Sequence, residues 1–228
     1  MFSVSALNTE WWFDKRIHNF GNIGFTGMLH ANVANFATRM IDKVAYNNRD
    51  IRSEILDDIP ANSIVCDLGC GVGLSTFDNP LSYGVDTSDE MINVAKRENT
   101  EKSCTFVEGN AISYGNNNQF SHCTIFYILH EAPRYGRKAV LKNAMRIASE
   151  EIIIADIDPS YKPSSMMLSG EPYVINYLEH IQHDIEKVCK RNNWYISTNK
   201  KYLDKHVRLW KLKPNYTRKV KQKYRIVL

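Results

Sequence analysis

The stretch Val65-Cys-Asp67-Leu-Gly69-Cys-Gly71-Val-Gly73 decides the fold, because a short apolar run leads directly into an acid and three closely spaced glycines. Residues 63–66 have the composition of a short buried strand. Glycines after a strand allow positive φ angles and let a ligand approach the backbone closely. In open α/β sheets, ligands bind where strands end and the chain turns back across the sheet. The stretch therefore predicts a first strand and a ligand-binding loop.

The glycine spacing does not fit a dinucleotide. The dinucleotide fingerprint is GxGxxG, but Leu74 stands in the third glycine slot after Gly69 and Gly71, and Thr76 in that slot after Gly71 and Gly73. Asp67 would also bring a carboxylate near a pyrophosphate, which is unfavourable. A cationic ligand with an amino group and no phosphate suits the loop better. S-adenosylmethionine (SAM), with its sulfonium and ammonium charges, is such a ligand.

The rest of the chain alternates apolar runs with helical periodicity. This alternation predicts βαβ units and a parallel sheet, ending in an antiparallel hairpin. Further strands are expected at residues 81–85, 105–107, 123–128, 151–155, 194–197 and 206–212, and helices at 88–98, 137–149 and 174–191. The expected domains are an N-terminal helical cap or lid (1–60), a SAM-binding domain (61–213) and a basic C-terminal tail (214–228).

A second carboxylate follows the second predicted strand. Asp86 lies nineteen residues after Asp67, at a strand end where an acid can accept hydrogen bonds from both ribose hydroxyls. Asn110 follows the third strand, where its amide could hydrogen-bond the adenine edge. The predicted cofactor-binding residues are Asp67, Gly69, Cys70, Gly71, Gly73, Asp86, Thr87, Asn110, Ala111 and Tyr127.

These motifs, with Gly84-Val-Asp86-Thr-Ser-Asp-Glu-Met-Ile92 and Ile125-Phe-Tyr-Ile-Leu-His130-Glu-Ala-Pro133, resemble the class I SAM-dependent methyltransferases over roughly residues 60–160. The resemblance is to the small-molecule type with a methyltransferase domain 11 or 25. It implies a Rossmann-like three-layer α/β sandwich, a seven-stranded sheet with a reversed last hairpin, and SAM across the carboxyl ends of the first strands.

Two features depart from that family. The stretch from Gly73 to the second strand is several residues short, which predicts a stunted first helix. Asn110 stands where the family usually has Asp, which predicts a weaker or differently oriented adenine contact.

The catalytic candidates are His130 and Glu131, at the end of the fourth strand and beside the expected methyl group. His130 has the intrinsic pKa of a base at neutral pH, but the alternative that it only hydrogen-bonds the backbone or forms a wall of the SAM site is favoured. Glu131 could be a partner of His130 or a helix-start acid. Glu171 and Tyr173, in the loop after the fifth strand, are predicted to contact the acceptor substrate, as is the N-terminal Trp12.

A metal site is not expected. His180 and His183 have a helical spacing and lie beside Glu179 and Asp184, but no further ligand of clear pattern converges on them. The five cysteines contain no CxxC pair, which favours reduced thiols and a cytoplasmic, intracellular protein. The sequence contains no run of 18 apolar residues, so membrane insertion is not expected.

Positive charge is concentrated at the C-terminus. Residues 199–228 hold eleven Lys and Arg and one acid, while the whole chain has a net charge of +4. The expected function is methyl transfer from SAM to an oxygen or nitrogen atom of a small-molecule acceptor. The alternatives are an RNA or other nucleic-acid methyltransferase, or a nucleic-acid-binding protein that uses the basic tail. A noncatalytic SAM-binding regulator also remains open, and the sequence does not assign an oligomeric state.

Overall fold

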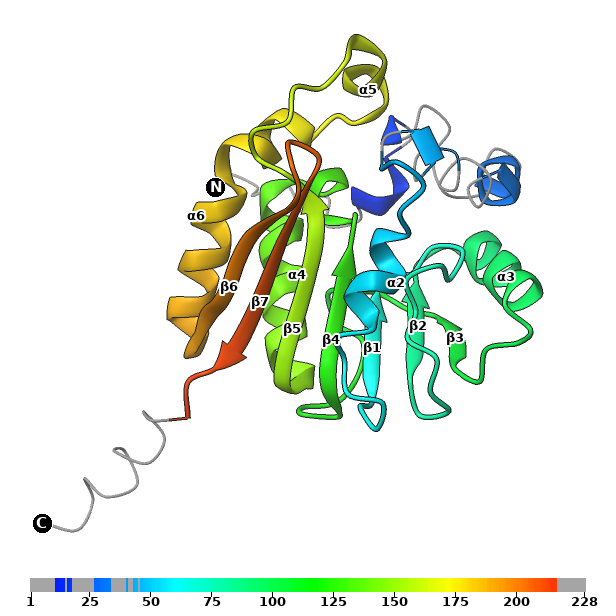
Figure 1. Ribbon diagram of the computed structural model, residues 1–228, viewed down its shortest axis with the longest axis vertical. Coiled ribbons are helices and arrows are strands. Elements are labelled where there is room, and N and C mark those ends of the chain that lie inside the picture. Colours follow the sequence, from blue (N-terminus) through cyan, green and yellow to red (C-terminus); the bar gives the residue numbers. More distant parts are fainter. Residues whose placement is uncertain are drawn as a thin grey trace, which may run out of the picture.

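The fold is a mixed seven-stranded sheet with helices on both faces, seen in a computed structural model that describes residues 11–14, 16–17, 27–33, 40, 43–44 and 46–216 (Figure 1). The strand order is β3-β2-β1-β4-β5-β7-β6. The strands are β1 (Val65–Leu68), β2 (Tyr83–Asp86), β3 (Thr105–Glu108), β4 (Phe120–Phe126), β5 (Ala148–Ile157), β6 (Trp194–Leu203) and β7 (Val207–Pro214). The first five strands pair in parallel, and β7 is antiparallel to both β5 and β6. The predicted Rossmann-like architecture with a reversed last hairpin is confirmed.

The helical segments are η1 (Trp11–Phe13), α2 (Ile51–Leu56), α3 (Asp89–Glu98), η3 (Leu129–Glu131), α4 (Arg134–Ile147), α5 (Ser165–Gly170) and α6 (Val174–Asn192). Alternation along β5 shows how the sheet is covered on both faces. Ile152 and Ile154 belong to the core that includes residues of α4 and α6, whereas Ile153 and Ala155 belong to the core that includes α2. A strand buried on both faces explains the continuous apolar run Ile152–Ala155.

No helix forms between β1 and β2: the described residues 69–82 contain only turns and extended chain. The sequence predicted a shortened helix here, and in the structure the helix is absent altogether. The Lys102 ammonium donates hydrogen bonds to the carbonyls of Gly73 (2.8 Å) and Thr76 (3.0 Å). These carbonyls are thus satisfied by a side chain instead of by the next helical turn.

Two expected boundaries differ from the structure. The helix predicted at 137–149 begins at Arg134 and ends at Ile147, and β5 follows without a loop. The loop predicted after the fifth strand contains the short helix α5, with the Ser164 hydroxyl accepting a hydrogen bond from the Met167 N–H as its N-cap.

The described N-terminal residues lie at the end of the sheet where the parallel strands finish, the same end as α5 (Figure 1). Trp11 is 7% exposed and packs against Gly136 in the first turn of α4, where a Cβ would lie 2.5 Å from the Trp11 Nε1. The Tyr173 hydroxyl donates a 2.8 Å hydrogen bond to Asp14. These contacts tie the described start of the chain to α4 and to the turn before α6.

Residues 217–228, most of the predicted basic tail, lie outside the described part of the chain, as do many residues of the predicted cap. Within the described residues, no helix combines the length and the apolar character needed to cross a membrane.

Candidate cofactor and acceptor site

The glycine loop takes the backbone geometry that only glycine adopts readily. Gly69, Gly71 and Gly73 have φ angles of +77°, +51° and +83°. A Cβ on Gly69 would overlap the Cδ1 of Ile128, and one on Gly73 would lie 2.7 Å from the Phe106 ring. A Cβ on Gly71 would meet nothing within 4 Å, because this glycine borders open space.

A cavity of about 110 Å³ opens beside this loop, at the carboxyl ends of β1, β2 and β4. The sequence-predicted residues in its lining are Trp12, Gly69, Gly71, Asp86, Thr87, Tyr127 and Glu131. Its location is the binding edge of an open α/β sheet. The structure therefore brings together about half of the predicted cofactor residues, one predicted substrate residue and one predicted catalytic residue.

Asp86 links the glycine loop to the start of α3. One carboxylate oxygen accepts a 2.9 Å hydrogen bond from the Gly71 N–H, and the other accepts a 3.0 Å bond from the Ser88 N–H. Desolvation raises the pKa of Asp86 to about 6; the two N–H donors work against this rise, and nearby Glu131 and Asp67 add to it. Each carboxylate oxygen has a second lone pair to offer a ligand.

Asp67 lies below the loop and does not line the cavity. Its carboxylate is fully buried and accepts 2.9 Å hydrogen bonds from the hydroxyls of Ser75, Thr76 and Thr124. Burial raises the pKa of Asp67, and these three donors oppose the rise. The carboxylate thus holds the turn after Gly73 against β4.

Cys70, Asn110 and Ala111 also lie outside the cavity lining. Cys70 is buried and packs in a cluster with residues of α3. The Asn110 Oδ1 accepts a 3.0 Å hydrogen bond from the Ile112 N–H, so the Nδ2 is the atom that could donate to a ligand. Ala111 is 7% exposed, and its carbonyl accepts a hydrogen bond from Asn143.

Tyr127 ends the β4 region in a conformation that is uncommon for an aromatic residue. Its φ angle is +55°, in the left-handed region. The Arg52 guanidinium lies 4.5 Å from the centre of its ring. Strained backbone of this kind is concentrated at functional sites, and Tyr127 borders the cavity.

His130 is held by a buried carboxylate. Its Nδ1–H donates a 2.7 Å hydrogen bond to Asp156 Oδ1, and Asp156 also accepts from the Leu129 and Ile157 N–H groups. Burial lowers the pKa of His130, but the carboxylates of Asp156, Glu171 and Glu131 outweigh it and raise that pKa to about 9. The imidazole therefore carries a proton at neutral pH, which does not suit a general base.

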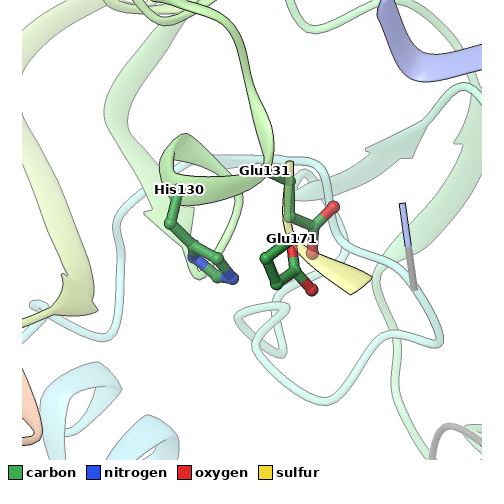
Figure 2. Close-up of side chains that lie close together, drawn as sticks. All are labelled: His130, Glu131 and Glu171. Carbon is green, nitrogen blue, oxygen red and sulfur yellow. The ribbon is translucent and has the colours of Figure 1, made fainter. Parts of the chain in front are cut away.

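Glu131 and Glu171 approach His130 from different elements. Glu131 follows it in η3, and Glu171 is the C-cap of α5. One potential ligand atom from each of the three side chains lies within 4.8 Å of the other two (Figure 2). The sequence named all three residues, but it assigned Glu171 to substrate binding and not to the neighbourhood of His130.

Tyr173 does not line the cavity. Its hydroxyl donates to Asp14, and the Arg16 guanidinium lies 5.7 Å from the centre of its ring. Trp12 does line the cavity, next to Trp11, whose ring lies 5.8 Å away in an edge-on arrangement. Tyr173 therefore holds the described N-terminal residues Asp14 and Arg16 against the start of α6.

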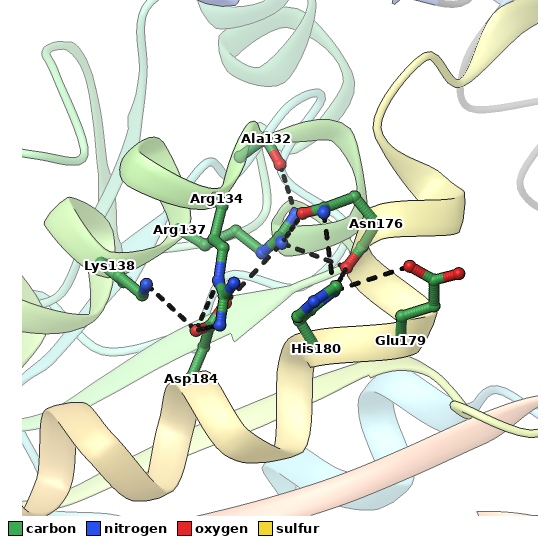
Figure 3. Close-up of polar contacts among 8 residues, drawn as sticks. All are labelled: Ala132, Arg134, Arg137, Lys138, Asn176, Glu179, His180 and Asp184. Atoms are coloured by element: carbon green, nitrogen blue, oxygen red, sulfur yellow. Dashed lines mark hydrogen bonds and ion pairs between the residues drawn. The ribbon is translucent and has the colours of Figure 1, made fainter.

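The histidine and acidic residues on α6 that could suggest a metal site form ion pairs and hydrogen bonds with other side chains. Asp184 is fully buried and forms ion pairs with Arg134 (2.9 Å), Lys138 (3.1 Å) and Arg137 (3.7 Å) (Figure 3). His180 faces Asn176 and Glu179. This network joins α4 to α6, which gives Asp184 a structural role.

Sequence reasoning missed several residues of the site, among them Asp156 and the cavity-lining Trp11, His30, Met91 and Ile128. The sequence assigned no role to Asp156, yet this residue of β5 orients His130. The available signal was an acid near the end of a parallel strand adjacent to the strand that precedes His130. Trp11 both packs in the core and borders the cavity.

Comparison with protein families matches residues 65–151 to the model of a methyltransferase domain. A comparison with curated protein sequences finds no match. The solved structures that resemble this chain include the magnesium protoporphyrin IX methyltransferase of Synechocystis PCC 6803 with bound SAH (18% identity; TM-score 0.53; 88% of this chain and 92% of that one).

Two further structures have the same fold. A SAM-dependent methyltransferase from Clostridium acetobutylicum is 13% identical, with a TM-score of 0.56 over 80% of this chain and 99% of that one. The Haloferax volcanii complex of the Trm112 activator with a methyltransferase gives 15% identity and a TM-score of 0.56, over 80% of this chain and 96% of that one.

The matched segment runs from the first strand through the glycine loop, Asp86 and His130 into β5. The resemblance drawn from the motifs is thereby confirmed. The chain therefore contains a methyltransferase domain, its fold is that of the class I SAM-dependent methyltransferases, and S-adenosylmethionine is the cofactor that this domain uses.

Proposed function

We propose that this methyltransferase transfers the methyl group to an oxygen or nitrogen atom of a small-molecule acceptor. The charge of the cavity carries this proposal. Asp86 and Glu131 are its acidic lining residues, and the described lining contains no Lys or Arg. A phosphodiester chain would enter such a site against repulsion, whereas nucleic-acid sites neutralise phosphates with basic side chains. Trp11 and Trp12 further enclose the cavity, as suits a small acceptor.

The cofactor site follows from the geometry of the loop. In this proposal Asp86 accepts hydrogen bonds from the ribose hydroxyls, and Gly69 and Gly71 let the methionine part approach the backbone. Thr87 and Tyr127 would contact the cofactor from the cavity wall, and Asn110 would donate to adenine through Nδ2. Asp67, Cys70, Gly73 and Ala111 would support the loop from beneath instead of touching the ligand.

SAM supplies a methyl group on a positively charged sulfur, which makes that carbon an electrophile without further activation. The protein has to position the acceptor in line and exclude water. His130 does not line the cavity, and it fits a supporting role beside it better than that of a base, because the surrounding carboxylates keep it protonated at neutral pH. Glu131 connects the cofactor cavity with the acceptor side of the site, since it lines the cavity and also adjoins His130.

The substrate side is formed by Trp12, Glu131 and Glu171, with Tyr173 acting through the N-terminal segment that it holds. We propose that residues 1–60 form a cap over the domain 61–213, and that the tail 214–228 is not needed for chemistry.

The test is a turnover screen with methyl-labelled SAM against separate pools of small metabolites and RNA. Full-length protein is compared with a variant that lacks residues 217–228. We expect the labelled methyl group to appear in small molecules, and we expect both proteins to turn over SAM at the same rate. Label in RNA that disappears with the deletion would instead support the nucleic-acid alternative.

A further inference from the structure

We infer that His130, Glu131 and Glu171 form a binding site for a divalent metal cation of the Mn²⁺ type, beside the cavity for the methyl donor. The three side chains offer one imidazole nitrogen and two carboxylate oxygens within 4.8 Å of one another. Ligands of a single ion at about 2.1 Å lie about 3–4 Å apart, so small side-chain rotations suffice to close the site. Mixed nitrogen and oxygen donors suit first-row divalent metals.

The imidazole is arranged as a metal ligand. His130 is 7% exposed, and its Nδ1–H is fixed by Asp156, so the ring is held with Nε2 toward the two glutamates (Figure 2). Among the described residues, this Nε2 makes no hydrogen bond. At metal sites, a histidine that ligates the metal through one nitrogen usually donates a hydrogen bond to a carboxylate, carbonyl or water through the other. Asp156 is therefore a positioning residue of this site.

The charge balance also favours a cation. Three carboxylates, those of Asp156, Glu131 and Glu171, surround one imidazole, and Asp156 and Glu171 are buried. Carboxylate oxygens are ligands that divalent cations of this kind prefer. A divalent ion neutralises the cluster and takes the place of the proton on Nε2.

The position of the site suggests its use. Glu131 borders the cavity, so a bound ion would have an open coordination position on the acceptor side. This use rests on the proposed function: an acceptor hydroxyl that binds the ion through oxygen loses its proton to solvent more readily. Its oxygen then bonds to the methyl carbon as the sulfur–carbon bond breaks, giving the methyl ether, S-adenosylhomocysteine and a proton. The acceptor class is therefore a hydroxylated small molecule that can chelate a metal.

The experiment is calorimetric titration of full-length, metal-free protein with Mn²⁺, together with the electron paramagnetic resonance spectrum of the bound ion. We expect one site, and at least about tenfold weaker binding in Glu171→Gln and in His130→Gln. The matched control is Glu179→Gln, which changes an exposed glutamate that also lies beside a histidine, His180. This control should bind Mn²⁺ as the wild type does.

SAM affinity, measured in the same samples, separates the two claims. Glu171 does not line the methyl-donor cavity, so Glu171→Gln should bind SAM normally, which also shows that it is folded. Absence of saturable Mn²⁺ binding, or equal binding by wild type and Glu171→Gln, overturns the metal site and leaves the methyltransferase assignment intact. Specific Mn²⁺ binding by a protein that transfers no methyl group to small molecules would overturn the proposed function alone.

Discussion

Asp156 and His130 come from neighbouring parts of the sheet edge and meet in a 2.7 Å hydrogen bond that is buried from solvent. The same carboxylate accepts the Leu129 N–H, so it fixes both the backbone before His130 and the ring itself. One acid at the end of β5 thus determines how the segment after β4 presents its histidine to the site.

Replacing this acid tests its positioning role. Asp156→Asn keeps the shape but removes the charge, and its amide nitrogen donates instead of accepting, so the hydrogen bond from either His130 or Leu129 is lost. Loss of such an outer partner lowers metal affinity or activity by about 10–100-fold. We therefore expect a Mn²⁺ affinity lower by that factor with an unchanged SAM affinity. If SAM binding weakens to the same extent, Asp156 acts on the fold in general instead of on His130.

The glycine loop offers a matched pair of substitutions. Gly69→Ala introduces a Cβ that overlaps Ile128, whereas a Cβ on Gly71 meets no atom within 4 Å. Both residues have positive φ, which costs a non-glycine residue about 1–2 kcal/mol. Gly71→Ala should therefore weaken SAM binding with a modest fall in Tm, and Gly69→Ala should lower both more strongly. Thermal unfolding and SAM titration of both variants measure this, and equal losses would contradict the packing argument.

The cofactor side of the site could be predicted from the sequence, because its residues follow strands that are consecutive along the chain. Gly69, Gly71 and Asp86 lie at strand ends, and parallel strands bring their carboxyl ends to one edge of the sheet. The sequence does not predict the direction in which each of these side chains points. Asp67 belongs to the same motif, yet its carboxylate turns inward to three hydroxyl groups.

The acceptor side of the site depends on contacts between distant segments. Glu171 reaches His130 only because α5 ends where it does, and this six-residue helix is too short to give a clear periodicity. The seven-stranded sheet could be predicted from apolar runs and turn residues. The meeting of Glu171 with His130 could not, because it is set by tertiary packing.

Asp184 provides a test of the structural core. Asp184→Asn leaves the fully buried Arg137 without its carboxylate partner. Breaking a buried ion pair from one side costs about 3–5 kcal/mol, so the free energy of unfolding in urea should fall by that amount. Glu186→Gln, on the exposed face of the same helix, is the control and should change it little. A loss below about 1 kcal/mol in Asp184→Asn would show that the network contributes little.

SAM affinity should depend on pH through Asp86. Because the pKa of this carboxyl is raised to about 6, it is ionised above that pH and increasingly protonated below it. The ionised form accepts hydrogen bonds from the ribose hydroxyls more strongly. The dissociation constant for SAM should thus increase as the pH falls from 7.5 to 5, and Asp86→Asn should show a flatter profile. Parallel profiles for the two proteins would assign the effect to another group.

Calorimetric titration of SAM into the wild type, Asp86→Asn and Asp89→Asn tests the cofactor site most directly. Asp89 is an exposed acid three residues farther along, in the first turn of α3, and serves as the matched control. We expect one SAM site in the wild type and in Asp89→Asn. In Asp86→Asn the binding free energy should be weaker by about 1.5–3 kcal/mol, the range for a hydrogen bond to a charged group. No SAM binding by the wild type, or equal affinity in all three proteins, would contradict the proposed cofactor site.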